Sequence, residues 1–243
     1  MSSYEFSQWA DIYEEAVGEM ARLTWAAGIV PEIIRSGLLK GSILDVGCGT
    51  GVGGRMLKAI APFRVVGLDR CPEMFQRSQG IYDRTIEADF GSFEIEDETF
   101  DFVVSGFDSL NYLTTERLGK FLESARRVLK PDGKIIFDYS APQLLHEQWR
   151  DKSDRQILSK GILDWTMKFR SSLEGCEIVL SWKDLAEREQ WTERHVQYTH
   201  DCYQVHVLAQ QAGLVVERVR NWNSEQFSPS VVTHLYVLVK GKA

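Results

Sequence analysis

The chain has 243 residues, of which 44% are hydrophobic and 26% charged, and its formal net charge is −7. This length and composition exclude a disordered or repetitive chain and fit one sizeable α/β domain. The negative charge argues against a nucleic-acid partner, because such binding draws on Lys and Arg side chains that neutralise phosphates. The sequence shows neither a basic and apolar leader nor a stretch near the roughly 18 apolar residues of a spanning helix, so we expect a cytoplasmic protein without a membrane partner.

The N-terminal half alternates helices and strands. Apolar residues at helical spacing over 13–34, with Gly37 as a stop, predict two helical segments before the first strand. Residues 42–46 predict a short buried strand, which a glycine-rich turn and a helix over 55–60 follow. The same unit recurs as strand 64–68, helix 72–79, strand 85–88, strand 100–105, helix 115–129 and strand 134–139. This alternation predicts right-handed crossovers and a doubly wound sheet.

The fifth and last strands have their own turn and cap residues. Residues 131–133, Pro-Asp-Gly, predict a turn before the fifth strand. A helix over 200–212 should end at Gly213. Residues 214–219 and 231–239 predict two closing strands, which we expect to form an antiparallel edge.

Between residues 141 and 199 the pattern becomes that of half-exposed antiparallel strands. Leu163, Trp165, Met167 and Phe169 alternate with polar residues, which is a period of two. Residues 178–182 repeat this pattern, and 191–198 predict a third strand. We therefore divide the chain into a main domain, residues 1–140 and 200–243, and an inserted β subdomain, residues 141–199, which covers one end of the sheet.

The four cysteines and the tryptophans of the insertion do not by themselves indicate a reaction or a ligand. Cys48, Cys71, Cys176 and Cys202 form no CxxC pair, so we expect neither a metal site nor a disulfide framework. Tryptophans 149, 165, 182 and 191 of the insertion predict core packing for at least two of them, while others could face a pocket. The oligomeric state stays open, a homodimer included.

The strongest motif is Leu-Asp-Val-Gly-Cys-Gly-Thr-Gly over residues 44–51, a strand that ends in an acid and runs into alternating glycines. Glycine is needed where backbone approaches a ligand closely or takes a positive φ. A tight turn without a ligand is the structural alternative.

A dinucleotide site is the main rival, because residues 49–54 formally contain GxGxxG. That motif should begin directly after the strand, and counted from Gly47 its third glycine position is Val52. Asp45 would also repel a pyrophosphate, whereas it would attract a ligand that bears an ammonium and a sulfonium. The charge therefore favours a cationic adenosyl ligand over a nicotinamide or a flavin.

Further acids follow the next two strands. Asp69 closes the second strand, where a carboxylate can accept hydrogen bonds from both hydroxyls of a ribose, and it could also cap the helix that starts at Pro72. Asp89 and Phe90 follow the third strand and would offer an acceptor and a flat apolar face to an adenine.

Residues 43–51, 67–69, 88–90 and 100–111 resemble motifs I, post-I, II and IV of the class I S-adenosylmethionine-dependent methyltransferases. The resemblance covers about residues 42–139 and, more loosely, the remainder. It implies a Rossmann-like seven-stranded sheet with an antiparallel β insertion after the fifth strand. Residues 107–112 are similar to the same region of small-molecule N-methyltransferases that act on amino sugars and glycine-type amines. Residues 4–13 resemble their cofactor-covering helix, and 191–198 resemble their lid.

The resemblance implies S-adenosylmethionine as the cofactor and S-adenosylhomocysteine as the product. The residues expected to hold it are Asp45, Gly47, Cys48, Gly49, Asp69, Arg70, Met74, Asp89, Phe90, Ser105 and Phe107. By resemblance, Asp45 and the backbone of Gly47 and Gly49 hold the methionine moiety and Asp69 the ribose. The resemblance also implies that Asp89, Phe90 and Met74 contact the adenine. This chain has aromatic residues at several lid positions where the family has Arg or polar ones, which leaves the acceptor open.

Methyl transfer from a sulfonium mainly needs an acceptor lone pair aligned with the breaking bond and water excluded. An amine must be neutral when it attacks, so a nearby carboxylate or imidazole would help. The catalytic candidates are Tyr13, Asp108, Asn111 and His195, with Tyr112 and Tyr198 beside them. For His195 a structural strand histidine, and for Asp108 a loop brace, are the alternatives.

We predict methyl transfer to a small-molecule amine. Three alternatives stay open: O-methylation of a small natural product, methylation of RNA or protein, and cofactor binding without methyl transfer. An Asn-Pro-Pro-Tyr-type tetrad is missing after the fourth strand, where residues 105–108 are Ser-Gly-Phe-Asp. Its absence and the acidic charge count against a macromolecular acceptor.

Overall fold

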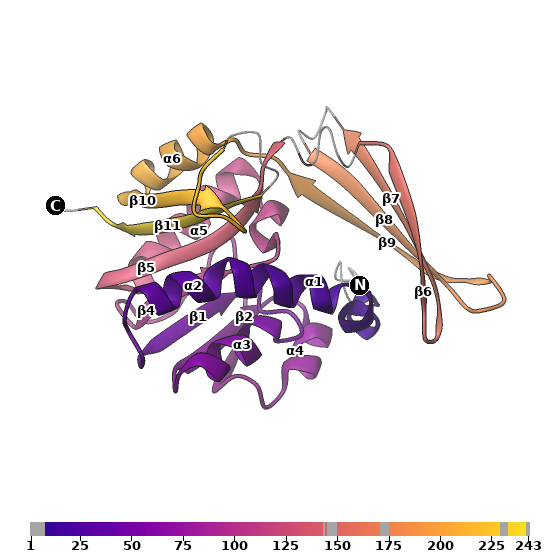
Figure 1. Ribbon diagram of the computed structural model, residues 1–243, viewed down its shortest axis with the longest axis horizontal. Coiled ribbons are helices and arrows are strands. Elements are labelled where there is room, and N and C mark those ends of the chain that lie inside the picture. The colour runs from indigo at the N-terminus through magenta and orange to yellow at the C-terminus, as the bar shows by residue number, and fades with distance from the viewer. Residues whose placement is uncertain (1–7, 143, 145–149, 171–174, 229–232, 242–243) are drawn as a thin grey trace.

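This computed structural model describes residues 8–142, 144, 150–170, 175–228 and 233–241. Two sheets make up the molecule: a seven-stranded sheet in the order β10-β11-β5-β4-β1-β2-β3, and a four-stranded sheet in the order β6-β7-β8-β9 (Figure 1). The second sheet follows the fifth strand in sequence and lies beside one end of the first. The predicted fold is confirmed, an α/β sheet with an antiparallel insertion after the fifth strand.

The seven-stranded sheet is mixed. Five strands are parallel neighbours: β1 (Ser42–Val46), β2 (Arg64–Asp69), β3 (Arg84–Glu87), β4 (Phe100–Ser105) and β5 (Leu129–Ser140). β11 (Thr233–Lys240) runs antiparallel between β5 and the edge strand β10 (Leu214–Asn221). From β1 the chain adds β2 and β3 on one side of the sheet, and it then returns to add β4 and β5 on the other side of β1. Open α/β sheets bind ligands at the carboxyl ends of the strands around such a reversal.

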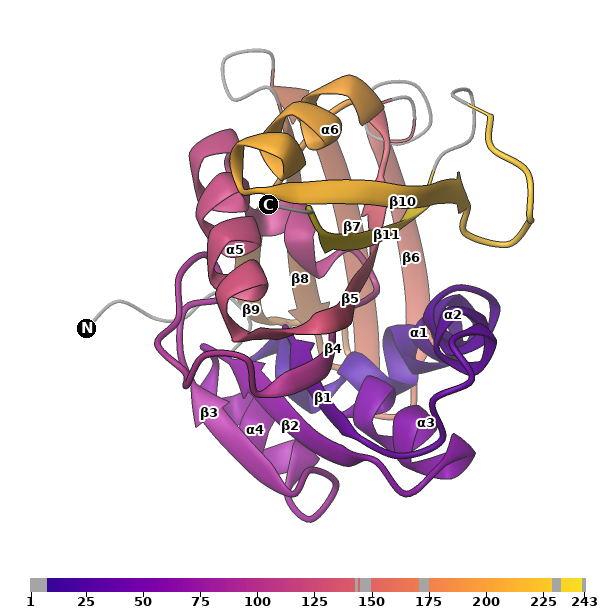
Figure 2. The same cartoon turned by 90° about the vertical axis from the view of Figure 1, so that its left-hand side faces the viewer.

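Helices cover both faces of this sheet, and Figure 2 shows the two groups on opposite sides. One group is α1 (Tyr13–Ala27), α2 (Ile29–Arg35) and α3 (Val52–Ile60). The other group includes α5 (Thr115–Val128) and α6 (Cys202–Gln211). Neighbouring residues of β1 serve the two layers: Ile43 packs with Trp25 and Ile33, while Leu44 packs in the cluster of α5 and α6. Burial on both faces explains why β1 is apolar throughout except at Ser42 and Asp45.

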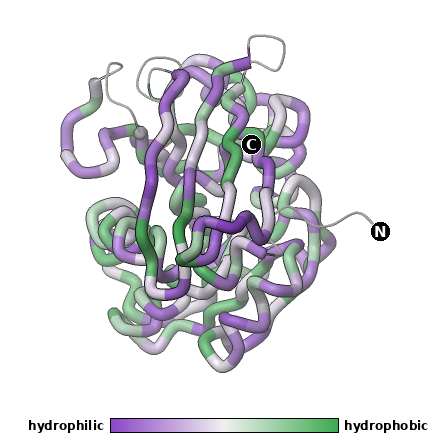
Figure 3. The backbone as a smooth tube through the Cα atoms, turned by 90° about the vertical axis from the view of Figure 1, so that its right-hand side faces the viewer, coloured by the Kyte–Doolittle hydropathy of each residue, from purple (hydrophilic) through white to green (hydrophobic). Residues whose placement is uncertain are grey.

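The second sheet is formed by β6 (Lys152–Leu158), β7 (Gly161–Arg170), β8 (Gly175–Lys183) and β9 (Glu189–Tyr198), all antiparallel. Its register sets Met167 opposite Ile178 and Ile178 opposite His195, so these side chains share one face. The other face carries ion pairs such as Arg155 with Asp164. Figure 3 looks onto this sheet and shows hydrophilic and hydrophobic stretches mixed along its strands. The sheet is therefore amphipathic, as the period of two predicted.

A third apolar cluster joins the second sheet to the rest. It brings together Trp9 of the 3-10 helix Trp9–Asp11, Met74 of α4 (Pro72–Ser78), and Ile178 and Leu180 of β8. The ring of Trp9 meets that of Trp165 edge-on at 5.2 Å. The N-terminal turn and α4 thus close the space between the two sheets from the side.

Several sequence predictions need correction. The strand β6 was not predicted, because residues 152–158 are mostly exposed and show no apolar alternation, and pairing with β7 makes them a strand. The turn predicted at 131–133 lies inside β5, where the register shifts between Phe100 and Phe102 and their partners advance from Leu129 to Lys134. A bulge thus takes up the extra residues. Trp149 and residues 4–7, 231 and 232, which entered the predictions, lie outside the described residues.

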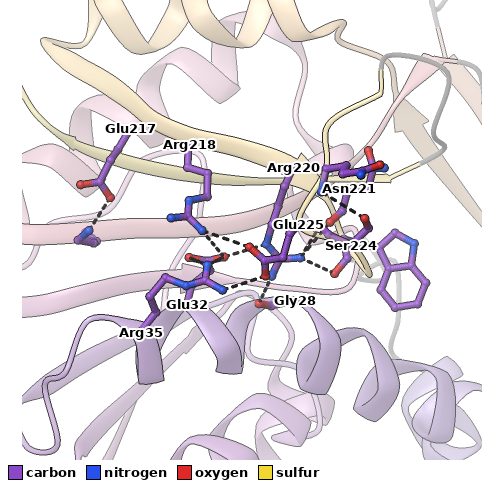
Figure 4. A network of polar contacts seen from close by, with 12 residues as sticks. Gly28, Glu32, Arg35, Glu217, Arg218, Arg220, Asn221, Ser224 and Glu225 are labelled. Atoms are coloured by element: carbon purple, nitrogen blue, oxygen red, sulfur yellow. Dashed lines mark hydrogen bonds and ion pairs between the residues drawn. The ribbon is translucent and has the colours of Figure 1, made fainter.

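A buried arginine ties the C-terminal part of the chain to the break between α1 and α2 (Figure 4). Arg220 on β10 is 2% exposed, and its Nε donates to Oε1 of Glu32 at 2.8 Å. Its guanidinium also donates to the carbonyl oxygens of Gly28, at 3.0 Å, and of Ala27, at 3.2 Å. These carbonyls lie where α1 ends and α2 begins, so Arg220 holds the junction of the two helices against β10.

Candidate active site

The turn after β1 is shaped by glycine. Gly47 has a φ of 73°, and a Cβ there would lie 2.8 Å from the side chain of Ser109. The N–H groups of Gly47 and Cys48 donate to the carbonyl oxygen of Leu68 at 2.8 and 3.0 Å. The backbone is therefore drawn tightly against β2, and α3 begins at Val52, earlier than the predicted residue 55. This leaves the turn open toward the carboxyl ends of the strands.

Asp45 is a buried carboxylate below this turn. The hydroxyl of Tyr82 donates to its Oδ2 at 2.6 Å, whereas Oδ1 has no hydrogen-bond partner among the described residues. Burial raises the pKa of Asp45 to about 7, and the hydrogen bond from Tyr82 opposes that rise. Asp45 lines a small cavity of about 30 Å³ together with Gly47 and Gly49. Because buried polar atoms are normally paired, the free oxygen fits a cationic or hydrogen-bonding ligand group.

Asp69, at the end of β2, connects two backbone segments of the site. Its Oδ2 accepts from the N–H of Gly49 at 2.9 Å, and its Oδ1 accepts from that of Cys71 at 3.0 Å. Burial raises the pKa of Asp69, and these backbone hydrogen bonds oppose the rise. The helix cap considered from the sequence is not formed by Asp69, since α4 is preceded by Cys71 as its capping residue. Asp69 faces a larger cavity, with lone pairs left for a ligand.

This larger cavity has a volume of about 350 Å³. It lies between the carboxyl ends of the central strands and the face of the second sheet that carries Met167, Ile178 and His195. The predicted site residues that line it are Tyr13, Gly47, Gly49, Asp69, Arg70, Met74, Phe90, Phe107, Asp108 and His195. Asp45 and Cys48 line the smaller cavity beside it. Twelve of the fifteen predicted residues therefore meet around two adjoining cavities.

Three predicted residues do not line either cavity. Asp89 accepts from Arg117 at 2.6 Å and from the N–H of Gly91 at 2.7 Å. The hydroxyl of Ser105 donates to the carbonyl oxygen of Val46 at 2.8 Å, which leaves the Ser105 side chain inside the sheet.

The third residue is Asn111, whose side-chain amide bonds to two other elements. Asn111 is fully buried; its Nδ2 donates to the carbonyl oxygens of Ser140 and Tyr198, both at 3.1 Å, and its Oδ1 accepts from the N–H of Ser140 at 3.0 Å. These bonds join β5, the turn after β4 and the end of β9.

The turn after β4 carries Asp108 to the cavity wall. Phe107 and Asp108 have φ values of 58° and 60°, so two consecutive residues other than glycine take the left-handed conformation. Asp108 is half-buried, and its Oδ1 accepts from the hydroxyl of Ser140 at 2.6 Å. Burial raises its pKa. Phe107 packs edge-on against Tyr13 at 6.4 Å, which brings α1 over the turn.

His195 lies on the opposite wall. It is 1% exposed, its Nε2 is 3.5 Å from Oε2 of Glu193, and its ring meets that of Tyr112 edge-on at 6.1 Å. Oε1 of Glu193 accepts from the N–H groups of Gln8 and Trp9 at 2.7 and 3.2 Å. Glu193 thus joins β9, the imidazole and the N-terminal turn, a connection that the sequence did not reveal.

The charges around the larger cavity are mainly negative. The carboxylates of Asp69, Asp108 and Asp154 line it, and Arg70 is the one Lys or Arg among its described lining residues. Within the described ranges, no group of three or more His, Cys, Asp or Glu side chains is placed to hold a metal ion. This environment suits a neutral or cationic ligand better than an anionic one.

Sequence reasoning missed a set of lining residues, most of them on the second sheet: Trp9, Val17, Met20, Ser109, Asp154, Gln156, Met167, Ile178, Leu180 and Gln197. Trp165, one of the tryptophans that the sequence left open, also lines the cavity, whereas Trp182 stacks with Trp191 at 6.3 Å. The period of two already placed residues 165, 167, 178 and 180 on shared faces. It gave no means to tell which face meets the central sheet.

Residues 43–133 match a protein-family model described as a methyltransferase domain. The match runs from β1 into β5, and this part of the chain is similar to a methyltransferase domain. A curated relative, the malonyl-acyl-carrier-protein O-methyltransferase of Halorhodospira halophila, is 30% identical over 122 residues, which are 46% of this chain and 40% of the relative. The chain thus matches two fifths of that relative's length.

Solved structures of methyltransferases share the fold over almost the whole chain. A S-adenosylmethionine-dependent methyltransferase from Clostridium acetobutylicum has a TM-score of 0.83 at 18% identity, covering 98% of this chain and 99% of its own. The CcbJ methyltransferase from Streptomyces caelestis has a TM-score of 0.80 at 14% identity and covers 96% of both chains. An amino pentose methyltransferase from Micromonospora echinaspora, solved with S-adenosylmethionine bound, has a TM-score of 0.63 at 18% identity and covers 98% of this chain and 96% of its own. The likeness of fold therefore extends to the second sheet. No described helix is long and apolar enough to cross a membrane.

Proposed function

We propose that this protein transfers a methyl group from S-adenosylmethionine to the nitrogen of a small-molecule amine. The main observation in favour of this cofactor is the buried carboxylate of Asp45. Its Oδ1 has no hydrogen-bond partner among the described residues, and the residue lines a cavity beside the glycine turn. An ammonium group placed there would satisfy that oxygen and neutralise the charge. The negative lining also disfavours the pyrophosphate of a dinucleotide, the main rival ligand.

The positions of the lining residues support the roles that the resemblance implies. Asp45 and the turn at Gly47 and Gly49 line the smaller cavity and would hold the methionine moiety. Asp69, Phe90 and Met74 line the larger cavity, where Asp69 would hold the ribose and the other two would pack on the adenine. When bound, S-adenosylmethionine supplies a methyl carbon on a positively charged sulfur. The chain's own contribution is to align the acceptor and exclude water, which the position of the cavity between the two sheets favours.

The acceptor wall favours an amine. Asp108 and Asp154 attract an ammonium, and His195 and Asp108 are placed to take the proton that an ammonium must lose before its lone pair attacks the methyl carbon. The apolar centre of the wall, formed by Trp165, Ile178 and Leu180, suits a hydrophobic or planar body. The amino pentose methyltransferase with the same fold acts on an amine-bearing sugar by its name, which supports a nitrogen acceptor here. We accordingly propose that the inserted region, residues 141–199, is the acceptor-binding part of the protein.

A panel experiment tests this function. The full chain is incubated with S-adenosylmethionine carrying a labelled methyl group and with matched amines, phenols and carboxylic acids, and products are read by mass spectrometry. We expect one labelled methyl group on amines and on neither of the other classes. Labelled phenols would establish the O-methyltransferase alternative. No labelled product, with S-adenosylmethionine bound in calorimetry, would favour a cofactor-binding protein without methyl transfer.

A matched pair of variants then tests the proton acceptors. His195→Gln keeps a polar side chain but removes the imidazole, and Asp108→Asn removes the charge at nearly constant volume. We expect at least a tenfold lower kcat from the residue that takes the proton, with S-adenosylhomocysteine affinity within about threefold of the wild type, since general-base assistance contributes about 10²–10⁴-fold. Unchanged kcat in both variants would show that positioning alone suffices.

A further inference from the structure

The carboxylate of Asp138 holds the turn that carries Phe107 and Asp108. Its Oδ2 accepts from the backbone N–H of Phe107 at 2.7 Å, and its Oδ1 accepts from that of Asp108 at 2.9 Å. Asp138 lies in β5 and is 1% exposed. Both N–H groups are thereby fixed to a central strand of the main sheet.

This clamp acts on strained backbone. The left-handed φ values of Phe107 and Asp108 are unfavourable for residues with a Cβ and persist only where the surroundings enforce them. The two hydrogen bonds that one carboxylate accepts supply such enforcement. The strained turn is also the segment that brings the side chains of Phe107 and Asp108 to the cavity wall.

Asp138 also places a second carboxyl group beside Asp108. Burial raises the pKa of both, and the nearby charge of Asp108 contributes to the rise in Asp138, whose pKa reaches about 7. The negative charge of Asp108 thus disfavours the ionisation of Asp138. The other titratable groups that act on Asp108 or are acted on by it are the phenols of Tyr13 and Tyr139, which burial keeps neutral by raising their pKa.

We propose that Asp138 is a positioning residue of the acceptor site, which holds the left-handed turn so that Asp108 faces the acceptor. This inference rests on the proposed methyl transfer, because the cavity must take an acceptor for the orientation of Asp108 to matter. Asp138 itself lies behind the turn and does not line the cavity.

Hydrogen exchange tests the clamp in the full chain saturated with S-adenosylhomocysteine. In Asp138→Asn the side-chain oxygen can accept only one of the two N–H bonds, and its amide group faces the other donor. We expect amide exchange at positions 107 and 108 to become at least tenfold faster. Asp101→Asn is the matched control, because Asp101 accepts from the N–H of Ser42 at 2.8 Å at the opposite end of the sheet. Unchanged exchange in D138N, or equal acceleration in D101N, would overturn the proposal.

A second variant keeps the test decisive if D138N does not fold. Asp108→Asn leaves the clamp in place and removes the charge that the Ser140 hydroxyl contacts. We expect the two amides to stay within threefold of their wild-type exchange rates. A loss of protection as large as tenfold would mean that the Asp108 side chain holds the turn, contrary to the proposal.

Kinetics separate positioning from general stability. With an amine identified by the panel, D138N should lower kcat at least tenfold and leave the S-adenosylhomocysteine Kd within threefold, because the variant misplaces Asp108 at the acceptor without touching the cofactor cavity. A kcat that falls only together with the melting temperature and the cofactor affinity would mean a purely structural role and would overturn the inference. If no amine is methylated, the proposed function fails, while the exchange experiment still decides whether Asp138 holds the turn.

Discussion

The hydroxyl of Tyr82 donates to one carboxylate oxygen of Asp45 at 2.6 Å, and the other oxygen has no hydrogen-bond partner among the described residues. Tyr82 thus fixes the carboxylate through Oδ2 and leaves Oδ1 to accept a hydrogen bond from a ligand. Asp45 is 1% exposed, so in the absence of a cation its ionised form is disfavoured. A ligand that brings a positive charge therefore favours the ionised form of Asp45.

This arrangement predicts a pH-dependent cofactor affinity. Burial raises the pKa of Asp45 to about 7, and only the ionised form attracts an ammonium. Binding then releases the proton that Asp45 holds, so the association constant for S-adenosylhomocysteine should rise by up to about tenfold per pH unit below about pH 7 and level off above it. Calorimetry at several pH values measures this, with Asp45→Asn expected to bind more weakly and with a flatter profile. A wild-type affinity independent of pH would contradict the assignment.

Asp69 and Asp89 form a second test, because both were expected at the cofactor and only Asp69 lines the cavity. Asp69→Ala removes charged acceptors from Gly49 and Cys71 as well as from the ligand. Hydrogen bonds to charged groups contribute about 1.5–3 kcal/mol each, so we expect a Kd at least about tenfold higher. Asp89→Ala, which removes a pair with Arg117, should change the Kd less than threefold. Equal losses from both variants would return Asp89 to the site.

Two helical glycines make a matched pair for the packing beside the turn. A Cβ on Gly53 would clash with the ring of Trp25 and lie 2.6 Å from Oδ2 of Asp45, whereas one on Gly119 would lie 3.6 Å from Cδ2 of Leu208. Gly53→Ala should therefore displace Trp25 or Asp45 and weaken cofactor binding at least tenfold. Gly119→Ala should leave binding intact and raise stability by about 0.5–1 kcal/mol, since alanine favours a helix over glycine. Thermal unfolding and calorimetry read both, and normal binding by G53A would refute the close packing.

Arg220 predicts the largest effect on stability. Arg220→Met leaves Glu32 buried with only Arg35, at 3.2 Å, and Arg218, at 3.9 Å, near its carboxylate. Removing one partner of a buried ion pair costs about 3–5 kcal/mol, so we expect a loss of about 3 kcal/mol in the free energy of unfolding. Arg155→Met, which breaks an exposed pair with Asp164, should cost less than about 1 kcal/mol. Denaturant unfolding compares them, and equal losses would contradict a special role for Arg220.

The main chain of the cofactor side followed closely from sequence. The strands at β1 and β4 have the predicted bounds, because each is a short apolar run buried on both faces and ends at a turn residue. The glycine turn and its acids were also visible, since motif and strand end lie next to each other in the chain. Asp89, Ser105 and Asn111 show the limit, because a residue at the right strand end can still turn its side chain toward Arg117, Val46 or Ser140.

The acceptor side depended on contacts between distant residues. Asp138 and Glu193 act on backbone N–H groups 30 and 184 positions away, at Asp108 and Trp9, and no local spacing reveals such pairs. β6 likewise became a strand through its pairing with β7, because its own residues lack an apolar face.

The sequence by itself determined the alternation of strands and helices in the seven-stranded sheet, the glycine turn and the acids beside it, because these depend on local periodicity and on residues adjacent in the chain. Only the tertiary structure decided which face of the second sheet meets the cavity, which acid holds which turn, and that Arg220 reaches Glu32 across 188 positions. The physical reason is that a buried charge or a strained turn is stable only with a specific partner, and chain folding, rather than spacing, brings that partner within hydrogen-bond distance.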